Sequence, residues 1–292
     1  MKRYRIERLL ASGGMADLYL ARDGAGQEVA IKRVKEHLQD EADLLEMFLR
    51  EAEIAARLRH PNIVEVCEVG EEDGLPYIVM PRLFGRDLRS ASGLGPREAC
   101  LVGAGVARGL AYAHGLRDEA DQPYGIVHRD VSPTNIFVTR GGEVRLLDFG
   151  IAKTNRFATA TGLIRGKAGY MAPEQLSGLA VDARTDLFAL GVVLWELLAS
   201  RPLWRAATET GVARAVMEES APPIEQLCPA AAGDLARLVA RLVAKFPAAR
   251  PTSVDRVADT LEELAKRHGS VDPGAELAHA LFTHHSHHSH RG

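Results

Sequence analysis

The chain has little cysteine, no long apolar run and no secretory signal. Its cysteines, Cys67, Cys100 and Cys228, are widely spaced and form no Cys-x-x-Cys pair, which excludes a disulfide scaffold and favours a reducing, cytoplasmic location. The longest nearly apolar segment, 187–195, ends at Glu196 and is far shorter than the ~20 residues of a membrane-spanning helix. The basic first residues are followed by no apolar stretch, so neither a signal peptide nor a membrane span is expected.

An excess of charge of one sign is also missing. The chain has 36 Lys and Arg residues against 39 Asp and Glu residues, for a net charge of −3. General nucleic-acid-binding proteins are distinctly basic, so no nucleic-acid partner is expected. The chain does have 292 residues, of which 46% are hydrophobic. This length exceeds the ~150 residues of a typical domain and predicts one large domain or two closely joined lobes.

Residues 4–80 are expected to form short strands around one helix. Alternating apolar residues interrupted by glycine turns are typical of antiparallel strands. The predicted strands are 4–10, 17–22, 27–34, 63–69 and 75–80. The charged segment 41–58, rich in Ala and Leu, has apolar residues three and four positions apart and is followed by Pro61. This spacing predicts a helix.

From Pro96 onward the pattern changes to helices. Proline clusters separate segments with helical spacing, and the predicted helices are 99–114, 186–199, 208–219, 230–243 and 254–267. Segment 126–152 carries two short β-like runs. The sequence therefore predicts an α+β protein with a small β-rich lobe at about 4–80 and a larger helical lobe at about 84–268. The histidine-rich remainder, 269–292, is expected to be an unfolded tail, and its histidines are assigned no metal site.

Two common phosphate-binding motifs are absent. The P-loop pattern fails near Lys167, because three residues separate the glycines instead of four and no hydroxyl follows the lysine. The dinucleotide-binding fingerprint fails as well. Gly13 and Gly14 instead lie between two predicted strands, where backbone N–H groups can cradle phosphates. Lys32 on the next strand can pair with these phosphates as a point charge, and Glu51 on the helix can hold the lysine.

Three further motifs follow downstream of Glu51. The chain reads HRDVSPTN at 128–135, DFG at 148–150 and APE at 172–174. Together with the glycine turn, Lys32 and Glu51, in this order, they make the sequence resemble a bacterial Hanks-type (eukaryotic-like) serine/threonine protein kinase over about residues 4–268. The resemblance implies the bilobal protein kinase fold and transfer of the γ-phosphate of ATP to serine or threonine hydroxyls of protein substrates.

The resemblance also implies a role for each matching residue. Asp130 would accept or orient the proton of the substrate hydroxyl, and Lys32, held by Glu51, would bind the α and β phosphates. Asn135 and Asp148 would hold Mg²⁺, with Mn²⁺ as an alternative ion. The expected nucleotide-binding residues are Leu10, Ala11, Ser12, Gly13, Gly14, Leu18, Ala30, Lys32, Met80, Pro81, Leu83, Asp87, Phe137 and Asp148.

Other matching residues have structural roles in the family. By resemblance, Glu174 would pair with Arg250, and Asp186 would accept hydrogen bonds from backbone N–H groups of the catalytic loop. A stacked apolar spine linking the two lobes would include His128, Phe149, Val66 and Ala55.

The chain departs from the family pattern at two places. Ala11 and Ala16 replace the first and third glycines of the glycine loop, which predicts a weaker grip on phosphate. The family has a lysine two residues after the catalytic aspartate, and this chain has Ser132 there. The family has a threonine in the segment before APE, and this chain has Lys167 there. We hypothesise that Lys167 supplies the missing charge and Ser132 stands in for the threonine. The alternative is a solvated lysine and a weakened site.

Regulation and competing functions follow from the same motifs. Arg129 precedes the catalytic aspartate, and phosphorylation of Thr154, Thr159 or Thr161 would create a dianion that can pair with it. A kinase dimer would allow this phosphorylation in trans.

The alternatives to an active protein kinase are a pseudokinase or weakly active nucleotide-binding signalling module, and a small-molecule kinase. The APE motif argues against a small-molecule kinase. The side chains for metal, phosphate and proton are all present, which favours an active protein kinase.

Overall fold

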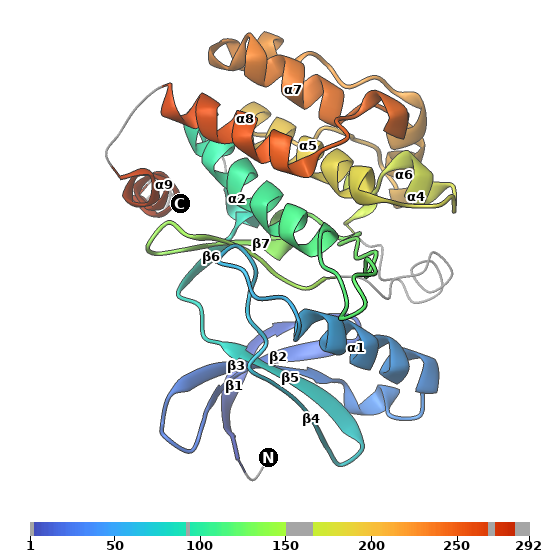
Figure 1. Cartoon of the computed structure of the whole chain (residues 1–292), viewed down its shortest axis with the longest axis vertical. Coiled ribbons are helices and arrows are strands. Elements are labelled where there is room, and N and C mark those ends of the chain that lie inside the picture. Colours follow the sequence, from blue (N-terminus) through green and yellow to red (C-terminus); the bar gives the residue numbers. More distant parts are fainter. Residues whose placement is uncertain (1–2, 92–93, 150–165, 268–271, 284–292) are drawn as a thin grey trace.

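A five-stranded antiparallel sheet forms the N-terminal lobe of the protein, drawn at the bottom of Figure 1. The structure is a computed structural model that describes residues 3–91, 94–149, 166–267 and 272–283. The strands are β1 (Arg5–Ser12), β2 (Ala16–Arg22), β3 (Glu28–Val34), β4 (Glu68–Glu72) and β5 (Leu75–Pro81). Their spatial order is β1-β2-β3-β5-β4, so the predicted antiparallel start of the chain is confirmed.

Helix α1 (Ala42–Ala55) covers this sheet. It lies within the predicted segment 41–58 and buries Phe48 and Ala52 in a cluster with Val34 and Ile78 of the strands. The same helix buries Glu51, which is 6% exposed. An apolar helix face therefore brings an acidic side chain to the inner side of the sheet.

The predicted strand 63–69 was wrong for most of its length. Ile63 forms an isolated bridge with Leu146, and the Val64 N–H donates to the carbonyl of Leu146 at 2.9 Å. The side chains of Ile63 and Val64 are buried. The apolar residues in this segment reflect burial where the two lobes meet and not membership of the N-terminal sheet, in which β4 begins only at Glu68.

The C-terminal lobe is helical and carries a small three-stranded sheet. Its helices are α2 (Pro96–His114), α4 (Pro173–Leu176), α5 (Ala183–Ala199), α6 (Glu209–Glu218), α7 (Asp234–Leu242) and α8 (Val254–Lys266). The small sheet has the order β6 (Gly85–Asp87), β7 (Ile136–Thr139) and β8 (Val144–Leu146). Short 3₁₀ turns are η1 (Glu36–Leu38), η2 (Leu88–Ser90), η3 (Pro133–Asn135), η4 (Ala168–Tyr170), η5 (Ile224–Gln226), η6 (Pro229–Ala231) and η7 (Pro247–Ala249).

Helix α5 is the centre of this lobe. Its residues from Thr185 to Leu198 are buried except for Glu196, as expected for a helix that is apolar on nearly every side. Helices α2, α7 and α8 surround it. The α+β, two-lobed architecture predicted from the sequence is thus confirmed, and among the described residues no helix is both long and apolar enough to cross a membrane.

Helix α7 is shorter than the predicted segment 230–243. The turn η6 occupies Pro229–Ala231, and Gly233 then adopts a φ of 92° before α7 begins at Asp234. This left-handed conformation is available to glycine and interrupts a helix. The apolar spacing predicts the helix correctly from Asp234 onward, but it does not predict the break at Gly233.

Residues 273–283 were expected to be unfolded and instead form helix α9 (Pro273–Thr283). Leu277 and Leu281, four positions apart, are buried at 1% and 3% exposure, and the Arg97 guanidinium donates to Glu276 at 2.9 Å. In Figure 1 this helix lies beside β6 and β7. The apolar face of α9 therefore continues the core, whereas the histidines at 284–290 lie outside the described residues.

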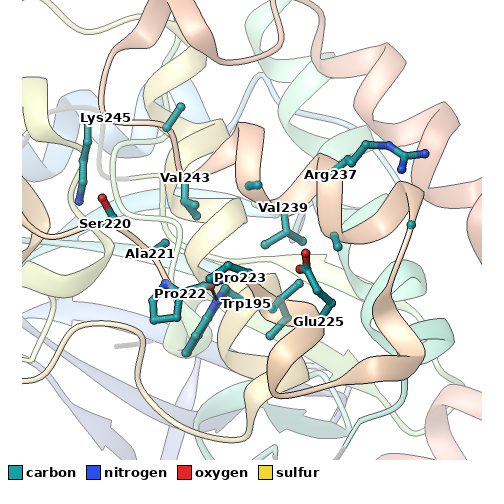
Figure 2. A pocket seen from close by; sticks show the side chains of 15 residues that line it. Trp195, Ser220, Ala221, Pro222, Pro223, Glu225, Arg237, Val239, Val243 and Lys245 are labelled. Atoms are coloured by element: carbon teal, nitrogen blue, oxygen red, sulfur yellow. Dashed lines mark hydrogen bonds between the residues drawn. The ribbon is translucent and has the colours of Figure 1, made fainter.

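A cavity of about 460 Å³ lies in the helical lobe. Figure 2 shows Lys245 at one end, Glu225 and Arg237 at the other, and Trp195 with Pro222 between them. The Trp195 indole N–H donates to the Pro222 carbonyl at 2.9 Å. This cavity is separate from the site described next, because the two share no lining residue.

Candidate active site

A cavity of about 600 Å³ lies between the two lobes. The structure brings all the sequence-predicted nucleotide-binding residues to its wall: Leu10, Ala11, Ser12, Gly13, Gly14, Leu18, Ala30, Lys32, Met80, Pro81, Leu83, Asp87, Phe137 and Asp148. Four of the other predicted catalytic residues also line it: Glu51, Asp130, Asn135 and Lys167. Residues far apart in sequence thus converge on one space large enough for a nucleotide.

Sequence reasoning missed several residues of this wall: Met15, Val64, Arg82, Arg89, Thr134 and Leu147. Val64 and Leu147 lie where the two lobes meet. The Val64 N–H donates to the Leu146 carbonyl, and the Leu147 N–H donates to the Asn135 carbonyl at 2.8 Å. Their apolar type offered no signal beyond core packing. Only the fold shows that they face the cavity.

The glycine turn joins β1 to β2 at the edge of the cavity. The Gly13 N–H donates to the Ala16 carbonyl at 3.0 Å, and a Cβ at position 13 would lie 3.1 Å from that oxygen. The turn is therefore tight at Gly13, where a side chain would crowd the backbone. Ala11 and Ala16 occupy the flanking strands, so the substitutions expected to weaken the loop lie outside the turn itself.

Lys32 lies between two carboxylates. Its Nζ is 2.9 Å from Asp148 Oδ1 and 3.3 Å from Glu51 Oε1. Burial disfavours the charged ammonium, but the neighbouring Asp148 and Glu51 carboxylates more than offset this, so the pKa of Lys32 is raised above its ordinary value. Lys32 therefore stays protonated as a fixed positive charge in the cavity, and β3, α1 and the DFG segment meet there.

Asp130 is held by two side chains. The Asn135 amide donates to the Asp130 carbonyl oxygen at 2.8 Å and to its Oδ2 at 2.9 Å. The Lys167 ammonium donates to the same Oδ2 at 2.8 Å. The Asp130 side chain is 10% exposed. These contacts fix the orientation of its carboxylate, which could otherwise rotate.

The catalytic loop is fixed from below by Asp186 of α5. The Oδ2 and Oδ1 atoms of Asp186 accept hydrogen bonds from the backbone N–H groups of His128 and Arg129, each at 2.8 Å. His114 Nε2 lies 2.7 Å from the same Oδ2. Arg129 has a φ of 63°, a left-handed conformation that the surrounding bonds must sustain. The structure thus shows the predicted contact of Asp186 with the loop.

The rings of His128 and Phe149 are in contact, as expected for the apolar spine. Their centroids lie 4.5 Å apart with the ring planes inclined by 45°, and His128 Nε2 is 3.0 Å from the Leu147 carbonyl oxygen. Val66 is buried in the N-terminal core, and Ala55 packs against that core. The contact between these two rings connects the catalytic loop with Phe149 of the DFG motif.

Glu174 and Arg250 form a buried ion pair. Arg250 Nη1 and Nη2 donate to the two carboxylate oxygens of Glu174 at 2.6 and 2.9 Å, and the Arg250 side chain is 0% exposed. Burial raises the pKa of Glu174, but hydrogen bonds from Arg250 and Thr185 outweigh it and hold the pKa below its usual range. This bidentate pair joins the APE segment to the C-terminal helices.

Ser132 lies outside the cavity wall. It is 1% exposed, and its hydroxyl is 3.0 Å from Thr134 Oγ1 and 3.5 Å from the Asp130 carbonyl oxygen. The three candidate phosphorylation sites, Thr154, Thr159 and Thr161, lie outside the described residues. The two residues of the exchange hypothesis therefore have different surroundings, since Lys167 faces the cavity and Ser132 is packed beneath it.

Asn135 and Asp148 offer oxygen donors for a hard divalent cation. Both line the cavity, and in the ranges that the structure describes no group of three His, Cys, Asp or Glu side chains could hold a metal by itself. In sites that bind nucleotides, Mg²⁺ is commonly held by one or two side-chain oxygens together with phosphate oxygens and water. The residues present fit such a cation.

The family model of the protein kinase domain matches residues 4–262, and the chain therefore belongs to the protein kinase family. Relatives include the tyrosine-protein kinase MasK of Myxococcus xanthus, 39% identical over 94% of this chain and 45% of the relative. The serine/threonine-protein kinase PrkC of Bacillus subtilis is 34% identical over 88% of this chain and 40% of the relative. The chain thus spans less than half the length of these curated relatives.

A solved structure with the same fold is the kinase domain of Mycobacterium tuberculosis PknI. It is 30% identical, with a TM-score of 0.68 over 90% of this chain and 95% of that domain. The resemblance to the bacterial Hanks-type kinases and the bilobal protein kinase fold predicted from the sequence are confirmed.

Proposed function

We propose that this chain transfers the γ-phosphate of ATP to serine or threonine hydroxyls of protein substrates. One observation carries the proposal: Lys32 with its two carboxylates and Asp130 with Asn135 line a single cavity between the lobes. Phosphoryl transfer needs positioning and charge neutralisation more than covalent chemistry, and these side chains supply both.

ATP binding would use both walls of the cavity. Leu18 and Ala30 of the N-terminal sheet and Phe137 of β7 would enclose the adenine, and the carbonyl of Pro81 and backbone of Leu83 would hydrogen-bond to it. Asp87 would contact the ribose. Lys32, permanently charged, would pair with the α and β phosphates while the glycine turn covers them.

Asn135 and Asp148 would hold Mg²⁺, with Mn²⁺ as the alternative ion, and the cation would neutralise charge on the phosphate oxygens. Asn135 has a second task, because its amide group donates to Asp130 at 2.9 Å. The side chain can meet both needs, since its carbonyl oxygen is the ligand and its NH₂ group is the donor.

Asp130 would act at the substrate hydroxyl. The hydroxyl oxygen attacks the γ-phosphorus, its proton passes to the Asp130 carboxylate, and the bond to the bridging oxygen breaks with its electron pair leaving on ADP. A small-molecule kinase is disfavoured, because the Glu174–Arg250 pair anchors the APE segment on which protein-substrate kinases rely. We further propose a cytoplasmic setting and a kinase dimer for autophosphorylation in trans.

Tyrosine is the second candidate acceptor. Ser132 stands where serine/threonine kinases carry lysine, and the relative at 39% identity is named a tyrosine-protein kinase. Phosphoamino-acid analysis of the labelled product separates the two acceptors. We expect phosphoserine and phosphothreonine, whereas phosphotyrosine alone would contradict the proposal.

The test of activity is transfer of labelled phosphate from ATP to casein in the presence of Mg²⁺. Asp130→Asn should lower the rate by about 100-fold or more, the range expected for loss of a general base. Asp121→Asn is the matched control, because the Asp121 side chain is 86% exposed and its positive φ suits asparagine. Nucleotide binding without transfer in the unmodified chain would indicate the pseudokinase alternative.

A further inference from the structure

The ammonium group of Lys167 lies at the point where the phosphoryl group would reach the substrate. Its Nζ is 2.8 Å from Asp130 Oδ2, and the Lys167 side chain is 26% exposed. Lys167 lines the same cavity as Lys32 and Asp148. A charge in this position is partly shielded from water and adjacent to the proposed base.

The other cations of the cavity wall are engaged elsewhere. Lys32 contacts Glu51 and Asp148, Arg89 is paired with Asp87 at 2.7 Å, and the Arg82 guanidinium lies 5.5 Å from the centre of the Phe84 ring. Among the described residues that line the cavity, Lys167 is therefore the cation in contact with Asp130. In the catalytic loop next to Asp130, Arg129 does not line the cavity and Ser132 is a buried hydroxyl.

The segment that carries Lys167 is anchored on both sides. The Gly166 N–H donates to Glu209 Oε1 of α6 at 2.6 Å, and the Tyr170 hydroxyl donates to Glu196 Oε2 of α5 at 2.6 Å. Ala168 between them is 1% exposed. The backbone that positions the lysine is thus fixed to the C-terminal lobe, which is the preorganisation that electrostatic catalysis requires.

We propose that Lys167 is a catalytic residue of this kinase, in an inference that rests on the proposed phosphotransfer. Its ammonium stabilises the negative charge of the γ-phosphoryl oxygens while the bond to the substrate oxygen forms and the bond to ADP breaks. The lysine keeps its proton throughout, and the hydroxyl proton passes to Asp130. The cation that the catalytic loop lacks at position 132 is thereby delivered by the segment before APE.

This assignment couples catalysis to the docking of that segment. A cation on the catalytic loop stays beside Asp130 whatever the segment does, whereas Lys167 reaches Asp130 only while Gly166–Tyr170 is docked against α5 and α6. Displacement of the segment would therefore remove a catalytic charge as well as a substrate-binding surface.

The test measures casein phosphorylation and ATP binding for Lys167→Met and Lys167→Arg in the full chain. Lys167→Met keeps side-chain length without charge and should lower kcat by about 100-fold, as loss of one oriented donor does in other enzymes. The Kd for ATP with Mg²⁺ should stay near that of the unmodified chain, because Lys32 is intact. Lys167→Arg should recover part of kcat. Lys266→Met, an exposed lysine at the end of α8, is the control.

The outcomes separate this inference from the proposed function. An unchanged kcat in Lys167→Met would make the residue a solvated lysine, and a higher kcat would mean that it blocks Asp130; either result overturns the assignment. Equal loss in Lys167→Met and Lys167→Arg, with lowered thermal stability in both, would assign only a packing role and also overturn it. An inactive unmodified chain would instead refute the proposed function.

Discussion

At the scale of single residues, Lys245 is a charge in a poorly solvated place. Its Nζ donates to the Val216 carbonyl and lies 3.8 Å from the centre of the Trp204 ring. It lines the cavity of the helical lobe (Figure 2). Burial lowers the pKa of Lys245 to about 8 from an ordinary value of 10.5, although the Glu219 carboxylate acts in the opposite direction. Lys245 therefore loses its proton at a lower pH in the folded chain than in the unfolded chain.

This shift predicts a pH dependence of stability. Below about pH 8 Lys245 is protonated in both the folded and the unfolded chain. Between pH 8 and 10.5 the unfolded chain binds more protons than the folded chain, so the free energy of unfolding increases with pH. Urea unfolding at pH 7, 8, 9 and 10 should show the unmodified chain gaining stability relative to Lys245→Met only above about pH 8. Lys266→Met is the control. A constant difference across this range would contradict the shift.

Sequence reasoning identified most residues that line the cavity, but not the apolar residues at the junction of the lobes. Lys32, Glu51 and Asp148 are identifiable because they match motifs of the protein kinase family in the same order, and the structure places both carboxylates within 3.3 Å of the Lys32 ammonium. Val64 and Leu147 could not be identified as wall residues. An apolar side chain in the core and one facing the cavity have the same sequence pattern.

At the scale of elements, α9 shows the strength of a short apolar face. Leu277 and Leu281 are buried, Arg86 Nη1 donates to the Leu281 carbonyl at 3.0 Å, and the Arg140 guanidinium lies 6.0 Å from the centre of the Phe282 ring. Arg86 lies in β6 and Arg140 follows β7, the strand that carries Phe137. Helix α9 therefore supports the sheet beneath the nucleotide site.

Leu277→Ala should lower the free energy of unfolding by about 2–5 kcal/mol, the range for truncating a buried leucine. The matched control is His279→Ala, an exposed position of the same helix, which should change stability by less than about 0.5 kcal/mol. Chemical denaturation of the two variants is the measurement. Equal stability of Leu277→Ala and the unmodified chain would mean that α9 does not contribute to the folded core.

The element predictions failed where local pattern and tertiary burial disagree. Residues 63–69 alternate like a strand, but Ile63 and Val64 pair with Leu146 across the junction of the lobes. Helix α9 was overlooked because the histidines that follow dominated the composition. Its signals were present in the sequence, namely Pro273 at the first turn and leucines four positions apart.

At the scale of the whole molecule, the proposed nucleotide would contact both lobes at once. The cavity wall includes strands β1, β2, β3 and β5 on one side and η3, β7 and the DFG segment on the other. A ligand that binds such a site stabilises the folded chain by mass action. With ATP and Mg²⁺ at 100 times Kd, the gain is about 2.7 kcal/mol, which for a domain of this size raises Tm by roughly 4–5 °C.

Thermal denaturation with ATP alone, with Mg²⁺ alone and with both measures this gain. We expect the largest shift with both, because Asn135 and Asp148 would hold the cation only together with phosphate oxygens. Asp148→Asn should lose most of the Mg²⁺-dependent part. A shift of equal size with and without Mg²⁺ in the unmodified chain would contradict the assignment of these two residues.

The backbone at the catalytic centre sets a limit on how this domain can be engineered. Arg129 and Asp148 adopt φ values of 63° and 43°, conformations that cost roughly 1–3 kcal/mol for residues with a side chain. Arg129 Nε is also buried without a hydrogen-bond partner among the described residues. Directed evolution for heat resistance alone would therefore reward glycine at Arg129, whereas Asp148 is retained by its ion pair with the buried Lys32 ammonium. The most thermostable descendants would be those that had lost the arginine next to the proposed base.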